Sequence, residues 1–298
     1  MFAIEFIKAC DSILKSCGLD LKLITFQCIP VGENKGFIEW VHGSVPLSEI
    51  CQPFANSFIG RKRSSGNNSS DDDTAEDPKS SAARAGLTKY ESLERSRDPN
   101  VTRNPVQDYL RSFAYDPDSP YLIHKDAMDA YIKSCAGYCA ITYILGVGDR
   151  HLDNLLLHQS GHFFHCDYSY ILGSDPKKYL PVRISEEMVN GMGGNKSDNY
   201  AMFLALTCAA FLTLRRPENA RYLLSLVRSM EGSLLPDLEQ NQSMEAAILG
   251  IRNRLRFDLS EDQAITFMEK MIEDSCSSKM WIAVDAIHTL GSDSRYSS

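Results

Sequence analysis

The residues best suited to chemistry lie in one short run, residues 146–157, and just after it. The run reads Gly-Val-Gly-Asp-Arg-His-Leu-Asp-Asn-Leu-Leu-Leu and contains Asp149, His151 and Asn154, and Asp167 follows after a short turn. Phosphoryl transfer needs a group that accepts the proton of the attacking hydroxyl. It also needs oxygen ligands that hold Mg²⁺ on the nucleotide phosphates. An acid, a histidine, an amide and a second acid form such a set, so the run indicates phosphoryl transfer.

The spacing and order of these residues narrow the chemistry. Asp149 stands five residues before Asn154, the interval that separates the catalytic aspartate from the metal-binding asparagine of protein kinases. The order Asp-Arg-His, in place of His-Arg-Asp, points away from protein kinases and toward a lipid substrate. Arg150 has two readings, as a phosphate contact or as a brace that holds Asp167 through a bidentate pair. Taken singly, each of these residues could instead end a helix or cap a turn.

Composition excludes several other classes of protein. The chain has 298 residues, of which 43% are hydrophobic and 23% charged, as in ordinary soluble globular proteins. A net charge of -8 argues against a nucleic-acid partner and gives no general attraction to anionic membranes. Nine scattered cysteines indicate a reduced, cytoplasmic chain. No apolar run approaches the roughly 18 residues of a membrane span, so we expect a soluble or at most peripheral protein.

Periodic apolar residues predict the elements that would hold these groups. A helix at 126–145 leads into the loop, and short strands at 155–157 and 162–166 form a hairpin behind it. The chemical residues would then lie on the loop into this hairpin and at its exit. His162, His165 and Cys166 do not predict a zinc site, because successive residues of a strand face opposite sides and these three side chains would not meet on one face. The other expected elements are a helix at 2–14, β-like stretches at 21–29 and 36–41, and helices at 197–214, 217–230, 243–256 and 261–290, the last with a capping box at Ser260 and Gln263.

Four segments resemble the class III (vacuolar-sorting) phosphatidylinositol 3-kinases. They are residues 133–157, from Lys-Ser-Cys-Ala-Gly-Tyr to Asn-Leu-Leu-Leu, Tyr-Ile-Leu-Gly-Ser-Asp-Pro-Lys at 170–177, Met-Val-Asn-Gly-Met-Gly-Gly at 188–194, and Leu-Asp-Leu-Lys-Leu at 19–23. The resemblance covers about residues 1–50 and 106–290. It implies an α+β, protein-kinase-like fold with a mainly helical C-lobe and a truncated N-lobe.

The resemblance also implies a division of the chain. Residues 1–56 would be a partial N-lobe with a helix and a hinge hairpin, and residues 106–291 the kinase C-lobe. Between them, residues 57–105 nearly lack large apolar side chains and contain an Asp-Asp-Asp run. Such a stretch cannot bury enough surface to offset its ordering entropy, so we expect a disordered insertion. The tail at 292–298 is short and polar and is also expected to be disordered.

Roles for single residues follow from the resemblance. His151 would be the base that deprotonates the inositol 3-hydroxyl, because the pKa of histidine lies near working pH. Asp149 would support His151, and Arg150 is counted with these two in the catalytic set. The remaining roles are Asn154 and Asp167 as ligands of Mg²⁺ or Mn²⁺ on ATP, Glu39, Trp40 and Val41 as the adenine hinge, and Lys177, Lys178 and Arg183 as activation-loop bases that face the lipid headgroup.

The implied activity is transfer of the γ-phosphate of ATP to the 3-hydroxyl of phosphatidylinositol in endosomal or vacuolar trafficking and autophagy. We expect a peripheral location on those membranes, with regulatory protein-kinase-like and beclin-type subunits. Two departures keep open a catalytically impaired kinase-like binding module. In the family a phosphate-binding loop and a lysine precede the helix with which this chain starts. Ser169 also stands where the family has the glycine of Asp-Phe-Gly, which restricts a positive φ. A metal-dependent phosphohydrolase is a third, weaker reading.

Overall fold

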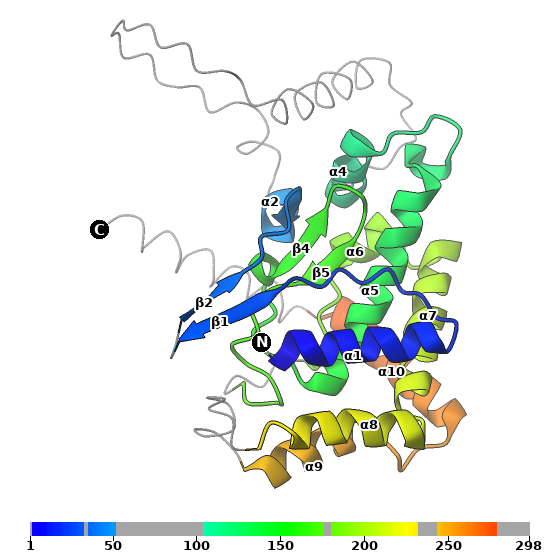
Figure 1. Ribbon diagram of the computed structural model, residues 1–298. Helices are drawn as coiled ribbons and strands as arrows, with labels where there is room; N and C mark the ends of the chain where they lie inside the picture. The colour runs from blue at the N-terminus through cyan, green and yellow to red at the C-terminus, as the bar shows by residue number, and fades with distance from the viewer. Residues whose placement is uncertain (1, 33–34, 52–103, 176–179, 232–242, 279–298) are drawn as a thin grey trace, which may run out of the picture.

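The computed structural model describes residues 2–32, 35–51, 104–175, 180–231 and 243–278 (Figure 1). The predicted insertion at 57–105 lies outside these ranges except for its last two residues, and so does the predicted tail. The described chain starts again at Asn104, two residues before the expected start of the C-lobe, and Asn104 caps the helix α4 (Pro105–Phe113) by accepting a hydrogen bond from the Gln107 N–H. None of the helices in the described ranges is both long and apolar enough to cross a membrane.

The N-terminal segment begins with helix α1 (Phe2–Ser16), which buries the predicted apolar face. A two-stranded antiparallel sheet follows, with β1 (Cys28–Gly32) and β2 (Lys35–Ile38). These strands are shorter than the stretches predicted at 21–29 and 36–41. Leu21 and Phe26 are buried in the core, and the Ile24 carbonyl accepts a hydrogen bond from the Tyr138 hydroxyl. The apolar residues before β1 therefore pack on the body of the protein and do not pair as a strand.

A second sheet positions the loop that contains Asp149, His151 and Asn154. Its order is β3 (Ser44–Pro46), β4 (Leu155–His158) and β5 (Phe163–His165), all antiparallel. The predicted hairpin is therefore confirmed, but it gains a third strand. β3 escaped prediction because it has three residues and ends in a proline, which is typical of an edge strand. The short helix α2 (Leu47–Cys51) follows β3 directly.

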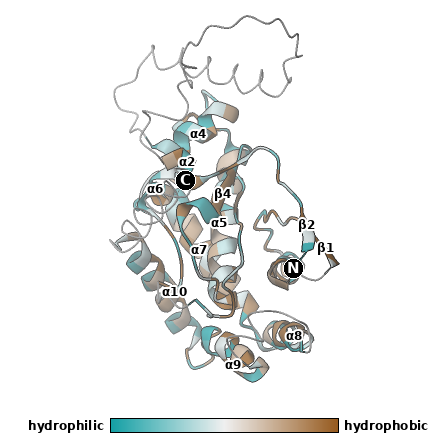
Figure 2. Cartoon of the chain, turned by 90° about the vertical axis from the view of Figure 1, so that its left-hand side faces the viewer, coloured by the Kyte–Doolittle hydropathy of each residue, from teal (hydrophilic) through white to brown (hydrophobic). Residues whose placement is uncertain are grey.

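The long helix α5 (Lys125–Leu145) is the centre of the molecule and is buried along most of its length. The sheet packs against it through β5, and α7 (Asp198–Leu214) contacts it along its length. Figures 1 and 2 show α8 (Pro217–Arg228) and α9 (Met244–Arg254) at one end of the molecule and α4 at the other. The helix α6 (Glu186–Gly191) packs on α4.

The C-terminal helix α10 (Glu261–Cys276) packs on α7 and begins with the predicted capping box at Ser260 and Gln263. It ends earlier than the predicted residue 290. Ser277 caps the helix by donating its N–H to the Glu273 carbonyl. The rest of the predicted helix, from residue 279 on, lies outside the described residues. Helices α4 and α6 were not predicted, although α4 has apolar residues at helical spacing. It directly follows the stretch expected to be disordered, and α6 has six residues.

Candidate active site

The loop that holds the chemical residues starts where α5 ends. Gly146 caps α5 in the left-handed region, with φ of 69°. A Cβ at this position would lie 2.6 Å from Arg254 Cζ and 2.8 Å from the Gly173 nitrogen. From here the chain runs beside residues 170–173, because the Gly148 N–H donates to the Tyr170 carbonyl and the Gly173 N–H to the Gly146 carbonyl, both at 2.9 Å. These bonds hold the catalytic run against the segment that follows Asp167.

Asp149 stands at the bend of this loop in a strained backbone conformation. Its φ of 50° is positive, which aspartate tolerates better than most residues. Its N–H donates to Asp175 Oδ2 at 2.8 Å, and its carbonyl accepts a hydrogen bond from Asn154 Nδ2, also at 2.8 Å. These two hydrogen bonds fix the main chain of Asp149 on both sides. Its carboxylate therefore starts from a fixed backbone position, and it remains partly exposed to solvent.

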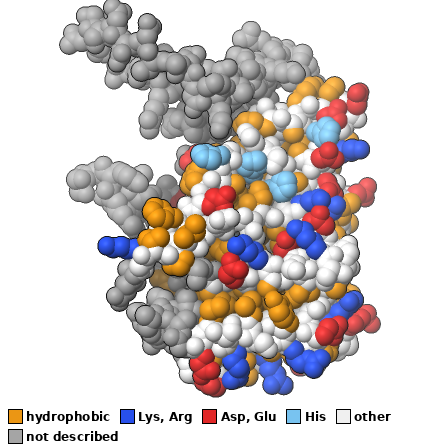
Figure 3. Space-filling view, viewed as in Figure 1, with side chains coloured by type: hydrophobic (Ala, Val, Ile, Leu, Met, Phe, Trp, Pro, Cys, Tyr) orange, Lys and Arg blue, Asp and Glu red, His pale blue; other side chains and the backbone are white. Residues whose placement is uncertain are grey.

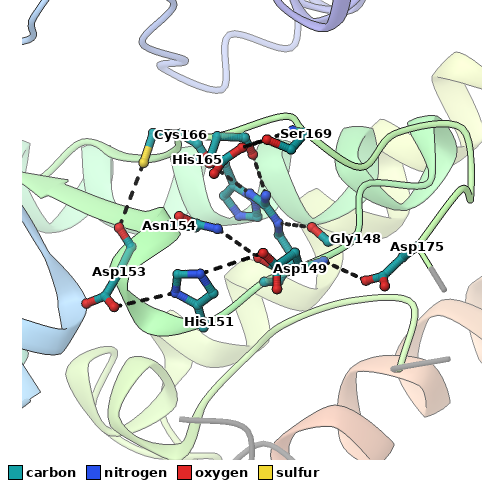
Figure 4. A network of polar contacts seen from close by, with 11 residues as sticks. Gly148, Asp149, His151, Asp153, Asn154, His165, Cys166, Ser169 and Asp175 are labelled. Atoms are coloured by element: carbon teal, nitrogen blue, oxygen red, sulfur yellow. Dashed lines mark hydrogen bonds and ion pairs between the residues drawn. The ribbon is translucent and has the colours of Figure 1, made fainter. Parts of the chain in front are cut away.

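His151 lies between two carboxylates (Figure 4). Its Nε2 is 3.8 Å from Asp149 Oδ2, and its Nδ1 is 3.6 Å from Asp153 Oδ2. Both distances are too long for direct hydrogen bonds, but they are short enough for ion pairs once the ring is protonated. The imidazole is 7% exposed. A nearly buried imidazole beside two acids is well placed to receive a proton.

Asp153 was not among the predicted site residues. The sequence offered one signal, an acid directly before Asn154 in the same loop. Its contacts could not be read from that signal, because one of its carboxylate oxygens accepts a hydrogen bond from the Ser48 hydroxyl of α2, 105 residues away. The structure thus brings a group from the segment after β3 to the catalytic loop.

Arg150 braces the loop through main-chain oxygens. Its guanidinium donates to the carbonyls of Gly148 at 2.6 Å, Cys166 at 3.1 Å and Asp167. The side chain is 4% exposed, and burial lowers the pKa of its guanidinium. Of the two readings left open by the sequence, the brace fits this geometry. It acts on the main chain of Asp167, however, and the contacts are not the bidentate pair with the carboxylate that we expected.

Asn154 and Asp167, the predicted metal ligands, each contact a different neighbour in the structure. Asn154 is buried and turns its amide nitrogen to Asp149, so its amide oxygen points to the other side (Figure 4). Asp167 is exposed and has a φ of 57°. Its Oδ1 accepts the N–H of Ser169 at 2.9 Å and the hydroxyl of Ser169 at 2.6 Å.

This donor set fits a hard divalent cation. Mg²⁺ prefers oxygen ligands and is usually held by one or two protein oxygens together with water and substrate phosphates. Within the described ranges, no group of three His, Cys, Asp or Glu side chains could hold a metal ion by itself. A cation held by Asn154 and Asp167 would complete its coordination with water and nucleotide phosphates, as is usual for Mg²⁺. Ser169 is not among the residues with positive φ, so serine at this position imposes no backbone strain.

His165, next to the site, is buried in the core of the protein, and the half-buried Cys166 packs against that core. The His165 ring stacks on Tyr138 with centroids 5.2 Å apart. Burial, followed by the nearby Arg150 charge, lowers the pKa of His165 well below its usual value. The His165 imidazole is therefore neutral at neutral pH, and its role is packing.

The predicted adenine hinge follows β2. Its first residue, Glu39, extends the hairpin, since the Glu39 N–H donates to the Gln27 carbonyl and the Glu39 side chain accepts the Gln27 N–H, both at 2.8 Å. The Val41 carbonyl accepts the N–H and the hydroxyl of Ser44. Trp40 is 64% exposed. Figure 3 shows an apolar group of side chains beside this hairpin, where Ile29 and Phe37 are also exposed.

Three basic residues were predicted to face the lipid headgroup, and the structure describes one of them. Lys177 and Lys178 lie outside the described residues. Arg183 is 5% exposed, which does not suit a side chain that should meet a lipid headgroup. The physical reason is that its neighbours enter the core: the Ile184 N–H donates to Ser275 Oγ of α10 at 3.0 Å, and this hydroxyl donates to the Val182 carbonyl at 3.0 Å. Sequence alone showed a basic residue but not the buried stretch around it.

Comparison with known proteins gives one family and several relatives. Residues 1–240 match the family described as phosphatidylinositol 3- and 4-kinase. Phosphatidylinositol 3-kinase pik3 of Schizosaccharomyces pombe is 43% identical over 288 residues, which are 96% of this chain and 30% of the relative. Phosphatidylinositol 3-kinase VPS34 of Saccharomyces cerevisiae is 31% identical over 288 residues, which are 96% of this chain and 27% of the relative. Phosphatidylinositol 3-kinase VPS34 of Arabidopsis thaliana is 41% identical over 184 residues, 61% of this chain and 22% of the relative. The chain thus spans less than a third of the length of these relatives.

Proposed function

We propose, from the premise that this chain belongs to the phosphatidylinositol 3- and 4-kinase family, that it transfers the γ-phosphate of ATP to the 3-hydroxyl of phosphatidylinositol. The observation that carries this proposal is His151 between Asp149 and Asp153, in the loop that also places Asn154. The 3-position is supported by the names of the relatives, which are called phosphatidylinositol 3-kinases.

In this mechanism His151 takes the proton of the inositol hydroxyl as that oxygen attacks the γ-phosphorus of ATP. The bond from this phosphorus to the β–γ bridging oxygen breaks, and ADP leaves. Asp149, 3.8 Å from Nε2, stabilises the imidazolium that results. Asn154 and Asp167 would hold the divalent cation, Mg²⁺ or Mn²⁺, which neutralises charge on the ATP phosphates when it is bound. Arg150 keeps the main chain of the loop and of Asp167 in register. Adenine would meet the main chain at Glu39, Trp40 and Val41.

The substrate lies in a membrane, and the chain would act there as a peripheral protein. Regulatory protein-kinase-like and beclin-type subunits, and an endosomal, vacuolar or autophagic membrane, are the partners and place that we propose from the resemblance to class III enzymes. Lys177 and Lys178 would face an unphosphorylated inositol ring. Arg183 is left out of this role because it is buried.

Replacement of His151 by alanine tests the proposal. In the full protein, with phosphatidylinositol vesicles, Mg²⁺ and ATP, His151→Ala should lower lipid phosphorylation about 10²–10⁴-fold, the usual effect of losing a general base. Asp129→Asn is a matched control, because this acid is paired with Lys133 on the surface of α5, away from the loop. Turnover that His151→Ala leaves unchanged would contradict the assigned base. Nucleotide binding without any transfer by the wild type would instead favour the kinase-like binding module.

A further inference from the structure

Asp153 lies in the proposed catalytic loop, and the proposed mechanism gives this acid no role. Each of its two carboxylate oxygens has a polar neighbour. Oδ2 lies 3.6 Å from His151 Nδ1, the ring nitrogen that faces away from Asp149. Oδ1 accepts a hydrogen bond from the Ser48 hydroxyl. The carboxylate therefore stands between the proposed base and the helix α2.

The α2 contact gives Asp153 a fixed position. Helix α2 packs on the short 3-10 turn Leu152–Asn154, and β3, which precedes α2, pairs with β4, which follows the turn. Asp153 is exposed, and an exposed side chain without such a contact would sample several rotamers. The bond from Ser48 selects the rotamer that turns Oδ2 toward the imidazole.

We infer that Asp153 is a positioning residue for His151, and that Ser48 positions Asp153 in turn. The Asp153 carboxylate favours a proton on Nδ1 and so leaves the lone pair on Nε2, the nitrogen on the side of Asp149. The second ring nitrogen of a histidine sets the tautomer of the first in this way. The gap of 3.6 Å is wider than a hydrogen bond. Such contacts are often long without substrate and tighten in the reacting complex. This inference rests on the proposed function, since it takes His151 to be the base.

The inference also links two parts of the chain. The predicted adenine hinge leads through β3 into α2, and α2 reaches His151 through Ser48 and Asp153. The orientation of the base is thus coupled to the segment that follows the hinge. Asp153 neither touches the reacting atoms nor takes the proton in this scheme, and its effect passes through His151.

A double-mutant cycle separates this role from a merely structural one. In the full protein, Asp153→Asn keeps the size of the side chain and should lower kcat for phosphatidylinositol about 10- to 100-fold, the effect of a misplaced reacting group. KM for ATP, KM for lipid and the Mg²⁺ concentration for half-maximal rate should each stay within about twofold. In the His151→Ala background the same change should alter kcat less than about twofold, because its target is gone.

Two results would overturn the inference. One is kcat of Asp153→Asn within about twofold of wild type, and the other is an equal loss in both backgrounds, which would mean that Asp153 acts on the loop as a whole. If His151→Ala alone leaves turnover intact, the assignment of the base fails, and that result is distinct from either of these. Asp129→Asn again serves as the control for a surface acid.

If Asp153→Asn does not fold, two substitutions of Ser48 test the inference in its place. Ser48→Thr keeps the hydroxyl and should retain kcat, whereas Ser48→Ala should lower kcat in the same direction as Asp153→Asn, by less. The loss in Ser48→Ala should again vanish in the His151→Ala background. Equal kcat in Ser48→Ala, Ser48→Thr and wild type would show that the bond to Asp153 does not position the base.

Discussion

Asp149, His151 and Asn154 lie in one loop, where the Asp149 carboxylate faces the imidazole and the Asp149 carbonyl accepts the Asn154 amide. The roles that their spacing indicated stay predictions. Arg150 shows the limit of such reasoning. Its charge suggested a carboxylate or phosphate partner, yet its guanidinium donates to main-chain carbonyls that precede and follow the β4–β5 hairpin in the sequence. A sequence does not reveal which carbonyls lack partners, and these depend on the final path of the chain.

Replacement of Arg150 by lysine should destabilise the protein. The guanidinium serves three carbonyls with a planar fork, and an ammonium group cannot satisfy all of them. Since each buried carbonyl without a partner costs about 1–3 kcal/mol, we expect Arg150→Lys to lower the free energy of unfolding by about 2–4 kcal/mol. Chemical denaturation measures this change. Arg252→Lys, at an exposed position of α9, is the control, and equal effects in the two variants would refute the brace.

Ser169 should make the predicted metal site weaker than it would otherwise be. Its hydroxyl donates to Asp167 Oδ1 at 2.6 Å and so competes with a cation for that oxygen. Ser169→Ala removes the hydroxyl and keeps the backbone. An exposed hydrogen bond of about 0.5–1.5 kcal/mol predicts a two- to tenfold lower Mg²⁺ concentration at half-maximal activity, measured by Mg²⁺ titration. A higher Mg²⁺ requirement in Ser169→Ala would mean that the bond prepares Asp167 for the cation.

At the scale of elements, long and strongly periodic segments were predicted well. The helices at α1, α5 and α7 and the hairpin of β4 and β5 are confirmed. Helix α1 has one apolar face, and α5 and α7 are long segments that are apolar on most sides. Short elements that owe their existence to distant partners were missed. β3 forms only by pairing with β4, which follows it by more than a hundred residues, and the stretch before β1 packs on α5 although its pattern predicts a strand.

The junction between α5 and the catalytic loop provides a paired test of this scale. Gly146→Ala places a Cβ at positive φ against Arg254 and the Gly173 main chain, and should destabilise the protein by at least about 1–3 kcal/mol. Gly250→Ala, inside α9, meets no atom closer than 3.6 Å and should stabilise the protein by about 0.5–1 kcal/mol. Thermal unfolding should show shifts of opposite sign. Shifts of the same sign would contradict the described junction.

At the scale of the whole molecule, the mainly helical, kinase-like lobe that the resemblance implied is confirmed by the family match over residues 1–240 and by the arrangement of helices around α5. The expected division into a unit at 1–56 and a unit at 106–291 stays a prediction. In the structure α1 packs on α7 and α8, and β3 joins the sheet of β4 and β5. Local patterns could not show this, since the contacts join residues far apart in the sequence.

The position of the transferred phosphate is the most direct test of the account. The family includes both 3- and 4-kinases, so lipid phosphorylation alone does not identify the reaction. The full protein should be incubated with phosphatidylinositol vesicles, Mg²⁺ and ATP labelled in the γ-phosphate, and the product deacylated and separated by position. We predict label at the 3-position in the wild type, and its loss in His151→Ala. Label at the 4-position, or label at the 3-position that persists in His151→Ala, would contradict the account.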